Sequence, residues 1–359
     1  MSTNERDRNE INSRAPKRTS KDRNERIKAA KRRKRRQRRR LGLLIATLII
    51  AIIALGVVQL FSSFSKLKRT SIDDKNLEIS DKFDKNSSNY SDIFKDIENI
   101  ALFGVDQKVD NVQRSDAIMI GTLDKTHKKL KVTSLMRDTY VNIPEYGYDK
   151  LTHAYAYGGA QLSIATINKN FDLNITDYVA VDFSELQSII DAIGGVDIEL
   201  DDEDIESLND YLSYVHEHDD EPYRQVERGS NGMVHLDGVE ALGYSRNRST
   251  PDGDFGRTER QRNLIDAMFQ RISGMGVAKL ASIMTKLLPY VETSLSNSEI
   301  LTLGTEVLSM GSLSVEKERF PRADYSENAI INDVFYYTFD EDIARQEIYD
   351  YLFNDKKTW

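Results

Sequence analysis

The residues in this sequence best suited to chemistry are arginines that stand beside turns and strand ends. Arg114 and Asp116 open a segment otherwise made of Ala, Ile and Met, and Arg137 follows another apolar run. Arg246 and Arg248 are two residues apart, so an extended backbone places both on one side. Because ligands of α/β folds bind at the ends of strands, guanidinium groups at such places predict recognition of an anion.

The segment DGDFGRTERQR at residues 252–262 adds to this pattern. Asp254 can cap the helix that is predicted to begin there. Arg257, Arg260 and Arg262 crowd the first turns of that helix, where the helix dipole disfavours cations. A bound anion would remove the conflict, because free N–H groups and guanidinium groups would converge on it. The competing interpretation is that these arginines only form salt bridges with the many acids of the chain.

The same helix carries a stripe of mixed character. Arg257 and Gln261 are four residues apart and lie on one helical face, and Leu264 and Met268 continue that face. A phosphate bound at one end of the stripe and an apolar chain along the rest would suit a phospholipid-like substrate.

Two acids complete the predicted site. Asp106 ends the apolar run NIALFGVD, and Asp116 begins the next one. In adjacent parallel strands these carboxylates need not meet, whereas a tight connection would bring them together. Two carboxylates beside phosphate oxygens are typical of a Mg²⁺ site, because that ion completes its shell with water and phosphate. No P-loop, G-x-S-x-G or H-E-x-x-H motif occurs, so nucleotide-loop, α/β-hydrolase and zinc-protease interpretations have no support.

An uncharged apolar segment separates two parts of opposite charge. Residues 1–40 carry 18 Lys/Arg and only 5 Asp/Glu, so this part is strongly basic. The whole chain carries 50 Lys/Arg and 58 Asp/Glu, so the part after residue 40 is acidic. The run at residues 41–61 is long enough to span a bilayer, and no A-x-A cleavage site follows it. We therefore expect a transmembrane helix over residues 41–62. The basic run before it predicts a cytoplasmic N-terminus and an extracellular catalytic domain on the cell membrane.

Residues 1–40 themselves are predicted to be a basic cytoplasmic tail without fixed structure. Contact with anionic lipid headgroups would explain their charge. A DNA-binding arm would need a specifying fold that this segment lacks, so no specific nucleic acid partner is expected. The chain has no cysteine, which excludes disulfides, thiolate chemistry and cysteine–zinc sites.

Beyond the span, residues 63–95 are polar and are predicted to be an extracellular stalk. Alternating strand and helix patterns then predict an α/β domain with helices on both faces of a sheet. The expected strands are residues 99–105, 117–122, 131–135, 178–181 and 196–200, and the expected helices are 160–171 and 183–193. The second half reads as mostly helical, at 237–245, 255–273, 276–290, 296–308 and 340–354, with a candidate strand at 313–319. The acidic stretch 201–221 is expected to be a solvated surface insertion.

Several of these segments together resemble the LytR–CpsA–Psr family of bacterial cell-envelope proteins. The resemblance rests on NIALFGVD, RSDAIMIGTLD, SLMRDTYVNIP, DKLTHAYAYGG, DYVAVDF, DAIGGVDIEL, LDGVEALGYSRNR and DFGRTERQR, which follow one another in the family's order between residues 99 and 262. It implies an α/β/α sandwich with a central mixed sheet and a hydrophobic tunnel for a polyprenyl chain. The catalytic core would be residues 96–273, and residues 274–359 a helical remainder of the same domain.

The resemblance also implies a phosphotransferase that moves an anionic glycopolymer, such as teichoic acid or capsular polysaccharide, from a polyprenyl-pyrophosphate carrier to peptidoglycan. By matching motif positions, Mg²⁺ would be held by two acids and the pyrophosphate by arginines, with a glutamine and a lysine beside them. These residues are Asp106 and Asp116 for the metal, Arg114, Arg137, Arg246, Arg248 and Arg257 for the pyrophosphate, and Gln261 and Lys150. Asp254 is our candidate for the base that deprotonates the acceptor hydroxyl, with Asp116 as the alternative.

Two positions depart from the family pattern. Met136 replaces the usual proline before Arg137, which should alter backbone stiffness and leave phosphate contacts intact. Gly243 stands inside a predicted helix, at a cost of about 1 kcal/mol in helix propensity. Two other functions remain open at this point: hydrolysis of the carrier pyrophosphate by the same site, and a non-enzymatic, membrane-held regulator of transcription.

Overall fold

The computed structural model describes residues 64–106, 112–219, 225–227, 232–251, 253–310 and 315–359. The predicted tail at 1–40 and the predicted transmembrane helix at 41–62 lie outside these residues. Within the described ranges, no helix has both the length and the apolar character that crossing a membrane requires. The described residues all belong to one unit, Ser63–Trp359.

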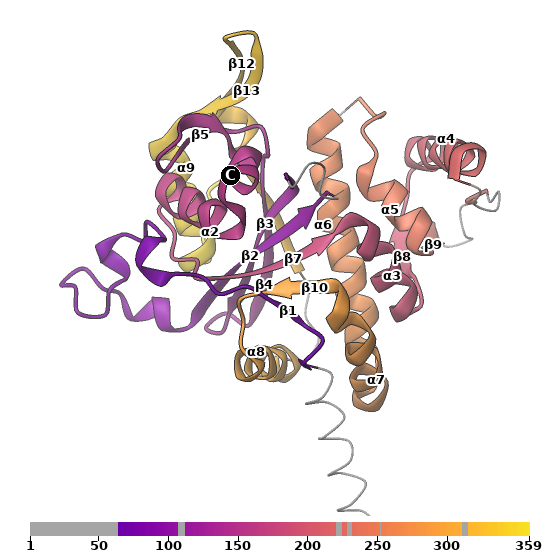
Figure 1. Ribbon diagram of the computed structural model, residues 1–359, viewed down its shortest axis with the longest axis horizontal. Coiled ribbons are helices and arrows are strands. Elements are labelled where there is room, and N and C mark those ends of the chain that lie inside the picture. The colour runs from indigo at the N-terminus through magenta and orange to yellow at the C-terminus, as the bar shows by residue number, and fades with distance from the viewer. Residues whose placement is uncertain (1–63, 107–111, 220–224, 228–231, 252, 311–314) are drawn as a thin grey trace, which may run out of the picture. The chain divides into compact units, whose positions relative to one another are not determined.

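A mixed seven-stranded sheet forms the middle layer, with strand order β1-β10-β7-β2-β3-β4-β11 (Figure 1). Its strands are β1 (Lys68–Arg69), β2 (Ile97–Val105), β3 (Ser115–Asp124), β4 (Lys129–Leu135), β7 (Asp177–Asp182), β10 (Val291–Thr293) and β11 (Val315–Phe320). β2 runs parallel to β7 and antiparallel to β3, while β4 is antiparallel to β3 and parallel to β11. The predicted α/β fold with a central mixed sheet is therefore confirmed.

Helices cover both faces of this sheet, as Figure 1 shows. One face packs against α2 (Leu151–Phe171) and α9 (Glu341–Phe353) through a large apolar core. The other face packs against α3 (Phe183–Ile193), α5 (Gly238–Arg246) and α6 (Gly253–Ser273). Strand β3 is buried on both sides, because Ile118 and Ile120 belong to the first core and Ala117 and Met119 to the second.

The remaining elements lie around these layers. The helices are α4 (Asp202–Asp219), α7 (Val277–Leu287) and α8 (Asn297–Ser309), and the two-stranded sheets pair β5 (Tyr140–Ile143) with β6 (Gly147–Lys150), β8 (Val196–Glu199) with β9 (Met233–Leu236), and β12 (Ser326–Ile331) with β13 (Val334–Phe339). The candidate strand at 313–319 is confirmed as β11. The helices predicted at 276–290, 296–308 and 340–354 are present as α7, α8 and α9, but residues 274–359 are not helical throughout, because β10 and β11 enter the main sheet and β12–β13 form a hairpin. Short strands with few apolar residues, such as β10, leave little periodic signal.

The predicted stalk is also wrong for the part that the structure describes. Residues 64–95 contain strand β1 at the edge of the main sheet and three short 3₁₀ helices, η1 (Asp74–Asn76), η2 (Asp81–Phe83) and η3 (Asp92–Lys95). Leu77 and Phe94 are buried in the same core as α2 and α9. The polar composition of this segment favoured a stalk, but a few well-spaced apolar side chains are enough to pack an irregular segment against the core.

The acidic stretch 201–221 is more than a solvated insertion. It contains the amphipathic helix α4, whose Leu208 and Leu212 are buried against α5 and its neighbours. This packing explains Gly243, because a Cβ atom there would lie 2.4 Å from Cδ1 of Tyr211. The glycine that weakens the helix propensity of α5 therefore permits α4 to approach it closely.

Truncating Phe353 at the end of α9 is expected to lower the free energy of unfolding by about 3–5 kcal/mol. Its ring is fully buried and lies 5.2 Å from the ring centroid of Phe94 and 5.6 Å from that of Phe83. Denaturant unfolding of Phe353→Ala measures the loss. Ile330→Ala on β12, where 69% of the residue is exposed, serves as the control and should change stability by less than about 0.5 kcal/mol. A Phe353 variant as stable as the control would show that residues 64–95 and α9 do not share one core.

Candidate active site

The structure brings together residues from four predicted motifs around one cavity of 220 Å³. Its walls are Asp116, Phe183, Arg246, Arg248, Arg257 and Gln261. Asp116 lies at the start of β3, the first two arginines lie at and just after the end of α5, and the last two residues lie in the first turns of α6. The last residues of β2 and the first residues of the antiparallel β3 therefore lie near the last turn of α5 and the first turn of α6.

Arg257 is the most deeply buried cation of this group. Its side chain is 3% exposed, and its Nη2 lies 3.3 Å from Oδ1 of Asp254. Among the described residues, its Nε and Nη2 donate no hydrogen bond. Burying a guanidinium group with unmet N–H donors costs free energy unless an acceptor is supplied. The unmet donors of Arg257 are therefore consistent with the anion site that the sequence predicts.

Asp254 lies between two of the arginines. Its Oδ1 is 3.5 Å from Nε of Arg248 as well as 3.3 Å from Arg257. That oxygen is buried and accepts no hydrogen bond from the part of the chain that the structure describes. The carboxylate thus offsets the charge of Arg248 and Arg257, although it does not itself line the cavity.

Asp106 and Asp116 do meet, because β2 and β3 are adjacent and antiparallel. The backbone N–H of Asp106 donates to the carbonyl oxygen of Arg114 at 3.1 Å. Burial, together with a hydrogen bond to Asp116 and the charge of that carboxylate, raises the pKa of Asp106 to about 6. Two carboxyl groups this close repel one another when both are ionised, and a divalent cation between them would relieve the repulsion. The pair therefore fits the predicted Mg²⁺ site.

A chain of charges links Asp116 to Lys150. Arg137 donates from Nη1 to Asp116 at 2.6 Å and from Nε to Asp138 at 3.2 Å. Lys150 donates to the other oxygen of Asp138 at 2.7 Å. Asp138 was not singled out from the sequence, although its position directly after Arg137 was the available signal. Arg114, in contrast, is exposed and does not line the cavity.

The other two arginines of α6 have different surroundings. Arg260 donates to Asp204 of α4 at 2.7 Å and to Thr250 at 2.8 Å, which matches the salt-bridge interpretation. Burial lowers the pKa of Arg262 to about 10. Neither side chain lines the cavity. Only Arg257 among the three arginines therefore belongs to the anion site.

An apolar cavity of 290 Å³ adjoins the arginines and shares Phe183 and Gln261 with them. Leu264 and Met268 line it, so the stripe predicted on α6 does run from a charged end to an apolar one. Its other walls are Leu102, Phe103, Gly104, Ala117, Met119, Val179, Val181, Leu186, Ile189, Ser245, Ile265, Ile272, Leu287 and Val291. A Cβ atom on Gly104 would lie 3.1 Å from the ring of Phe183, so glycine leaves room for that ring.

Phe183 was missed by the sequence analysis. Its ring forms part of both cavities, and the guanidinium carbon of Arg246 lies 5.8 Å from the ring centroid. That contact holds the cation by its attraction to the ring face. The only available signal was its position in the segment DYVAVDF, directly after a strand.

Met136 contributes more than backbone stiffness. Its N–H donates to the carbonyl oxygen of Phe320 at 3.1 Å, so it joins the end of β4 to the end of β11. A proline at this position could not donate that hydrogen bond. The departure from the family pattern therefore fixes the strand that leads into Arg137.

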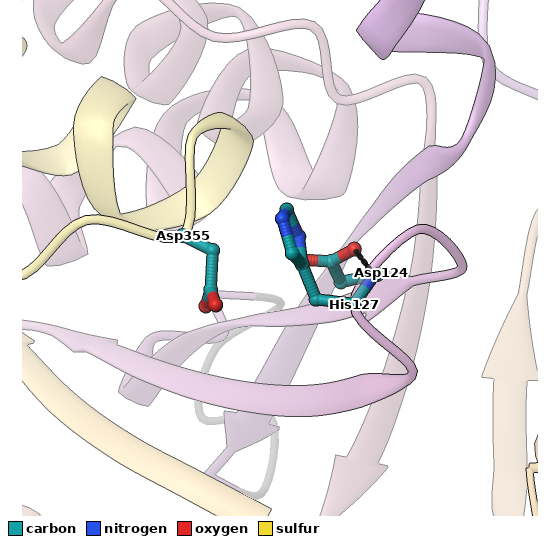
Figure 2. A group of neighbouring side chains, drawn as sticks. All are labelled: Asp124, His127 and Asp355. Atoms are coloured by element: carbon teal, nitrogen blue, oxygen red, sulfur yellow. Dashed lines mark hydrogen bonds and ion pairs between the residues drawn. The ribbon is translucent and has the colours of Figure 1, made fainter.

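A second group of possible metal ligands lies at the other end of β3. Figure 2 shows Asp124 bonded to His127, with Asp355 of the C-terminal segment facing them. The buried Nζ of Lys131 lies 3.4 Å from Asp124 and 3.0 Å from Asp355, and Lys129 contacts Asp355 at 2.8 Å. Because two ammonium groups already neutralise the two carboxylates, this cluster is an ion-pair network that ties α9 to the sheet.

Comparison with known proteins identifies the class. The LytR_cpsA_psr family matches residues 56–350, and the chain belongs to that family. In the solved structure of TagT bound to LIIa-WTA, 25% of aligned residues are identical, with a TM-score of 0.60 over 80% of this chain and 98% of that one.

Two curated relatives are similar to the chain at the level of sequence. One is the polyisoprenyl-teichoic acid–peptidoglycan teichoic acid transferase TagU of Bacillus cereus (strain AH820), 32% identical over 62% of this chain and 69% of its own length. The other is the regulatory protein MsrR of Staphylococcus aureus (strain COL), 31% identical over 71% of this chain and 74% of its own length. The chain spans about two thirds of the length of its TagU relatives.

Replacing Asp116 with Asn tests the contact between the two carboxyl groups. The change removes a like charge and lets an amide N–H donate to the Asp106 carboxylate, so the pKa of Asp106 should fall from about 6 toward 3.8, while burial keeps it from falling all the way. Carbon-detected NMR titration of the Asp106 carboxyl measures this. Asp197→Asn on β8, where half of the side chain is exposed, is the control and should leave the pKa unchanged.

The same variant has a predicted effect on stability. Because the folded protein binds the Asp106 proton more tightly than the unfolded chain does, this group's contribution to stability falls as the pH rises from 3.8 to about 6. Asp116→Asn should weaken that fall, which denaturant unfolding at a series of pH values would reveal. An unchanged pH dependence would argue against the contact.

Proposed function

We propose that this protein transfers an anionic glycopolymer from a polyprenyl-pyrophosphate carrier to peptidoglycan. The observation that carries the proposal is that the arginine cavity and the apolar cavity share Phe183 and Gln261. A ligand with a charged head and an apolar chain fits two cavities that adjoin in this way. The name of the relative TagU describes such a transfer of teichoic acid and supports this substrate class.

In this proposal, the arginines hold the pyrophosphate. Arg257, Arg246 and Arg248 surround the cavity and would donate to phosphate oxygens, and Gln261 would donate beside them. Arg137 would act from the far side of Asp116. The apolar cavity would hold the first part of the polyprenyl chain, whose burial supplies binding free energy in proportion to its area.

The reaction is a substitution at phosphorus. The oxygen of a peptidoglycan sugar hydroxyl forms a bond to the phosphorus nearest the polymer, and the bond from that phosphorus to the bridging oxygen breaks. Polyprenyl phosphate leaves with the electron pair, and the hydroxyl proton passes to Asp254, whose Oδ1 has no hydrogen-bond donor among the described residues. The arginines stabilise the negative charge that develops on the phosphate oxygens.

Asp106 and Asp116 are the residues that would hold Mg²⁺. When bound, such an ion neutralises negative charge on the pyrophosphate. The two carboxyl groups already share a hydrogen bond, and loading with the ion requires that their proton be released.

We further propose that the reaction takes place at the outer face of the cell membrane. The apolar run at residues 41–61 would anchor the chain there, next to a substrate that is itself held in the membrane by its lipid.

Replacing Arg257 with Ala is expected to reduce transfer by about 100- to 1,000-fold, as for other donors that act on developing charge. Arg257→Lys keeps the charge without the planar fork and should recover part of the rate. The assay uses the full-length chain in detergent, a polyprenyl-pyrophosphate glycan and peptidoglycan, with polymer attached to peptidoglycan as the product.

Arg271→Ala is the matched control, because this arginine lies near the other end of α6 and donates to backbone carbonyls of residues 193 and 194. It should keep the wild-type rate, and thermal unfolding verifies that each variant folds. Release of free phosphorylated polymer without attachment would identify a phosphatase. Attachment at the wild-type rate by Arg257→Ala would exclude the proposed site.

Removal of divalent ions is expected to stop transfer, and added Mg²⁺ to restore it. Isothermal titration of the chelated protein with Mg²⁺ provides a second readout that does not depend on turnover. Asp106→Asn and Asp116→Asn should each weaken Mg²⁺ binding by at least tenfold, about 1.4 kcal/mol. Asp124→Asn at the ion-pair network provides the control, and equal Mg²⁺ affinity in all three variants would contradict the assignment.

A further inference from the structure

Three exposed tyrosines lie near one another beside the active site. Tyr146 and Tyr148 belong to the β5–β6 hairpin and its turn, and Tyr157 belongs to α2; they are 56%, 52% and 43% exposed. Two further tyrosines support them, Tyr140 of β5 and the buried Tyr336 of β13. We call these five residues the tyrosine platform. Exposed aromatic groups of this extent commonly mark a binding surface.

The rings are arranged in pairs. Tyr146 and Tyr157 stack with centroids 4.7 Å apart and planes inclined by 16°, and Tyr140 and Tyr148 stack at 5.1 Å and 28°. Tyr140 also meets Tyr336 edge-on at 4.9 Å. Figure 1 shows the elements that carry them, β5, α2 and the β12–β13 hairpin, at one end of the domain. The pairing limits side-chain motion, so little conformational entropy remains to be lost when a ligand packs on the rings.

Asp149 anchors the platform from within. Its carboxylate accepts hydrogen bonds from the hydroxyl groups of Tyr157 at 2.6 Å and Tyr336 at 3.4 Å. It also pairs with Nδ1 of His153 at 2.8 Å. The hydroxyl groups of Tyr157 and Tyr336 are therefore bonded within the protein, and the exposed Tyr146 and Tyr148 present their rings and hydroxyl groups to a ligand.

A chain of side-chain contacts connects the platform to the active site. Lys150, the residue after Asp149, lies 5.7 Å from the ring centroid of Tyr336 and donates to Asp138. Asp138 in turn pairs with Arg137, which bonds Asp116. The platform and the carboxylates of the active site are therefore joined by one network of side-chain contacts.

We propose that the tyrosine platform binds the glycan strand of the peptidoglycan acceptor, an inference that rests on the proposed function. The C–H faces of pyranose rings are apolar and pack well on aromatic rings. An anionic polymer with a phosphate in every repeat would instead need a row of free cations, whereas Lys150 and His153 are already paired with carboxylates and the exposed Arg114 near Tyr157 is a single charge. The glycan strand is thus the better match, because every residue of it offers a pyranose face, and its hydroxyl groups are the acceptors that the proposed transfer requires.

The test measures binding apart from transfer. The full-length chain in detergent is titrated with soluble, uncrosslinked glycan strands, and separately with lipid-free teichoic acid. Tyr146→Ala combined with Tyr148→Ala should raise the dissociation constant for glycan strands by about tenfold or more, the loss typical of a buried aromatic contact. The corresponding double Phe variant keeps the rings and should bind like the wild type. In the transfer assay, the Ala variant should raise KM for the acceptor with kcat unchanged.

Tyr214→Ala is the matched control, since this tyrosine is 58% exposed and stacks on His218 of α4, outside the platform. Unchanged glycan affinity in the double Ala variant would overturn the inference. A selective loss of affinity for teichoic acid would also overturn it and would assign the surface to the donor polymer. If the wild type transfers no polymer and the double Ala variant still loses glycan binding, the proposed function fails and the glycan site stands.

Discussion

The constraint on which this structure depends is the need to keep one arginine, Arg257, out of water beside an apolar cavity. Arg257 is almost fully buried, and Phe183 separates its cavity from walls that are nearly all hydrocarbon. Carboxylates make this possible, because Asp254 and Asp116 lie within ion-pair distance of the guanidinium groups. The layers of the fold bring these opposite charges together, because β2 and β3 place carboxylates at one end of the sheet and α5 and α6 place the arginines next to them.

The sequence predicted much of this arrangement because its signals are local. The strands at β2, β3, β4 and β7 are apolar runs bounded by polar residues, and the α6 stripe depends only on helical spacing. The segments that were misjudged depend on distant partners. Strand β10 is three residues long and exists because β7 and β1 flank it, and residues 64–95 are fixed by side chains such as Phe94 that reach a core formed elsewhere.

The candidate site divides in the same way. The sequence predicted that several arginines bind an anion. It could not show that Arg257 lines the cavity while Arg260, one turn later on the same helix, does not. Their difference arises from α4, which brings Asp204 to Arg260 and leaves Arg257 to the cavity. Asp138 and Phe183 were missed for the same reason, since their roles depend on contacts with Lys150 and Arg246 across the fold.

The two edges of the main sheet have a consequence for how the protein reaches its native state. β1 pairs with β10, and β4 pairs with β11. Strands near the beginning of the domain can therefore complete this pairing only after strands near its end have been synthesised. Helix α9 then packs against the core around α2. Such long-range closure makes folding slow, because chain entropy is lost before the contacts that compensate it are formed. The domain cannot be completed before β11 and α9 have been synthesised, and its sheet edges need protection from other chains until then.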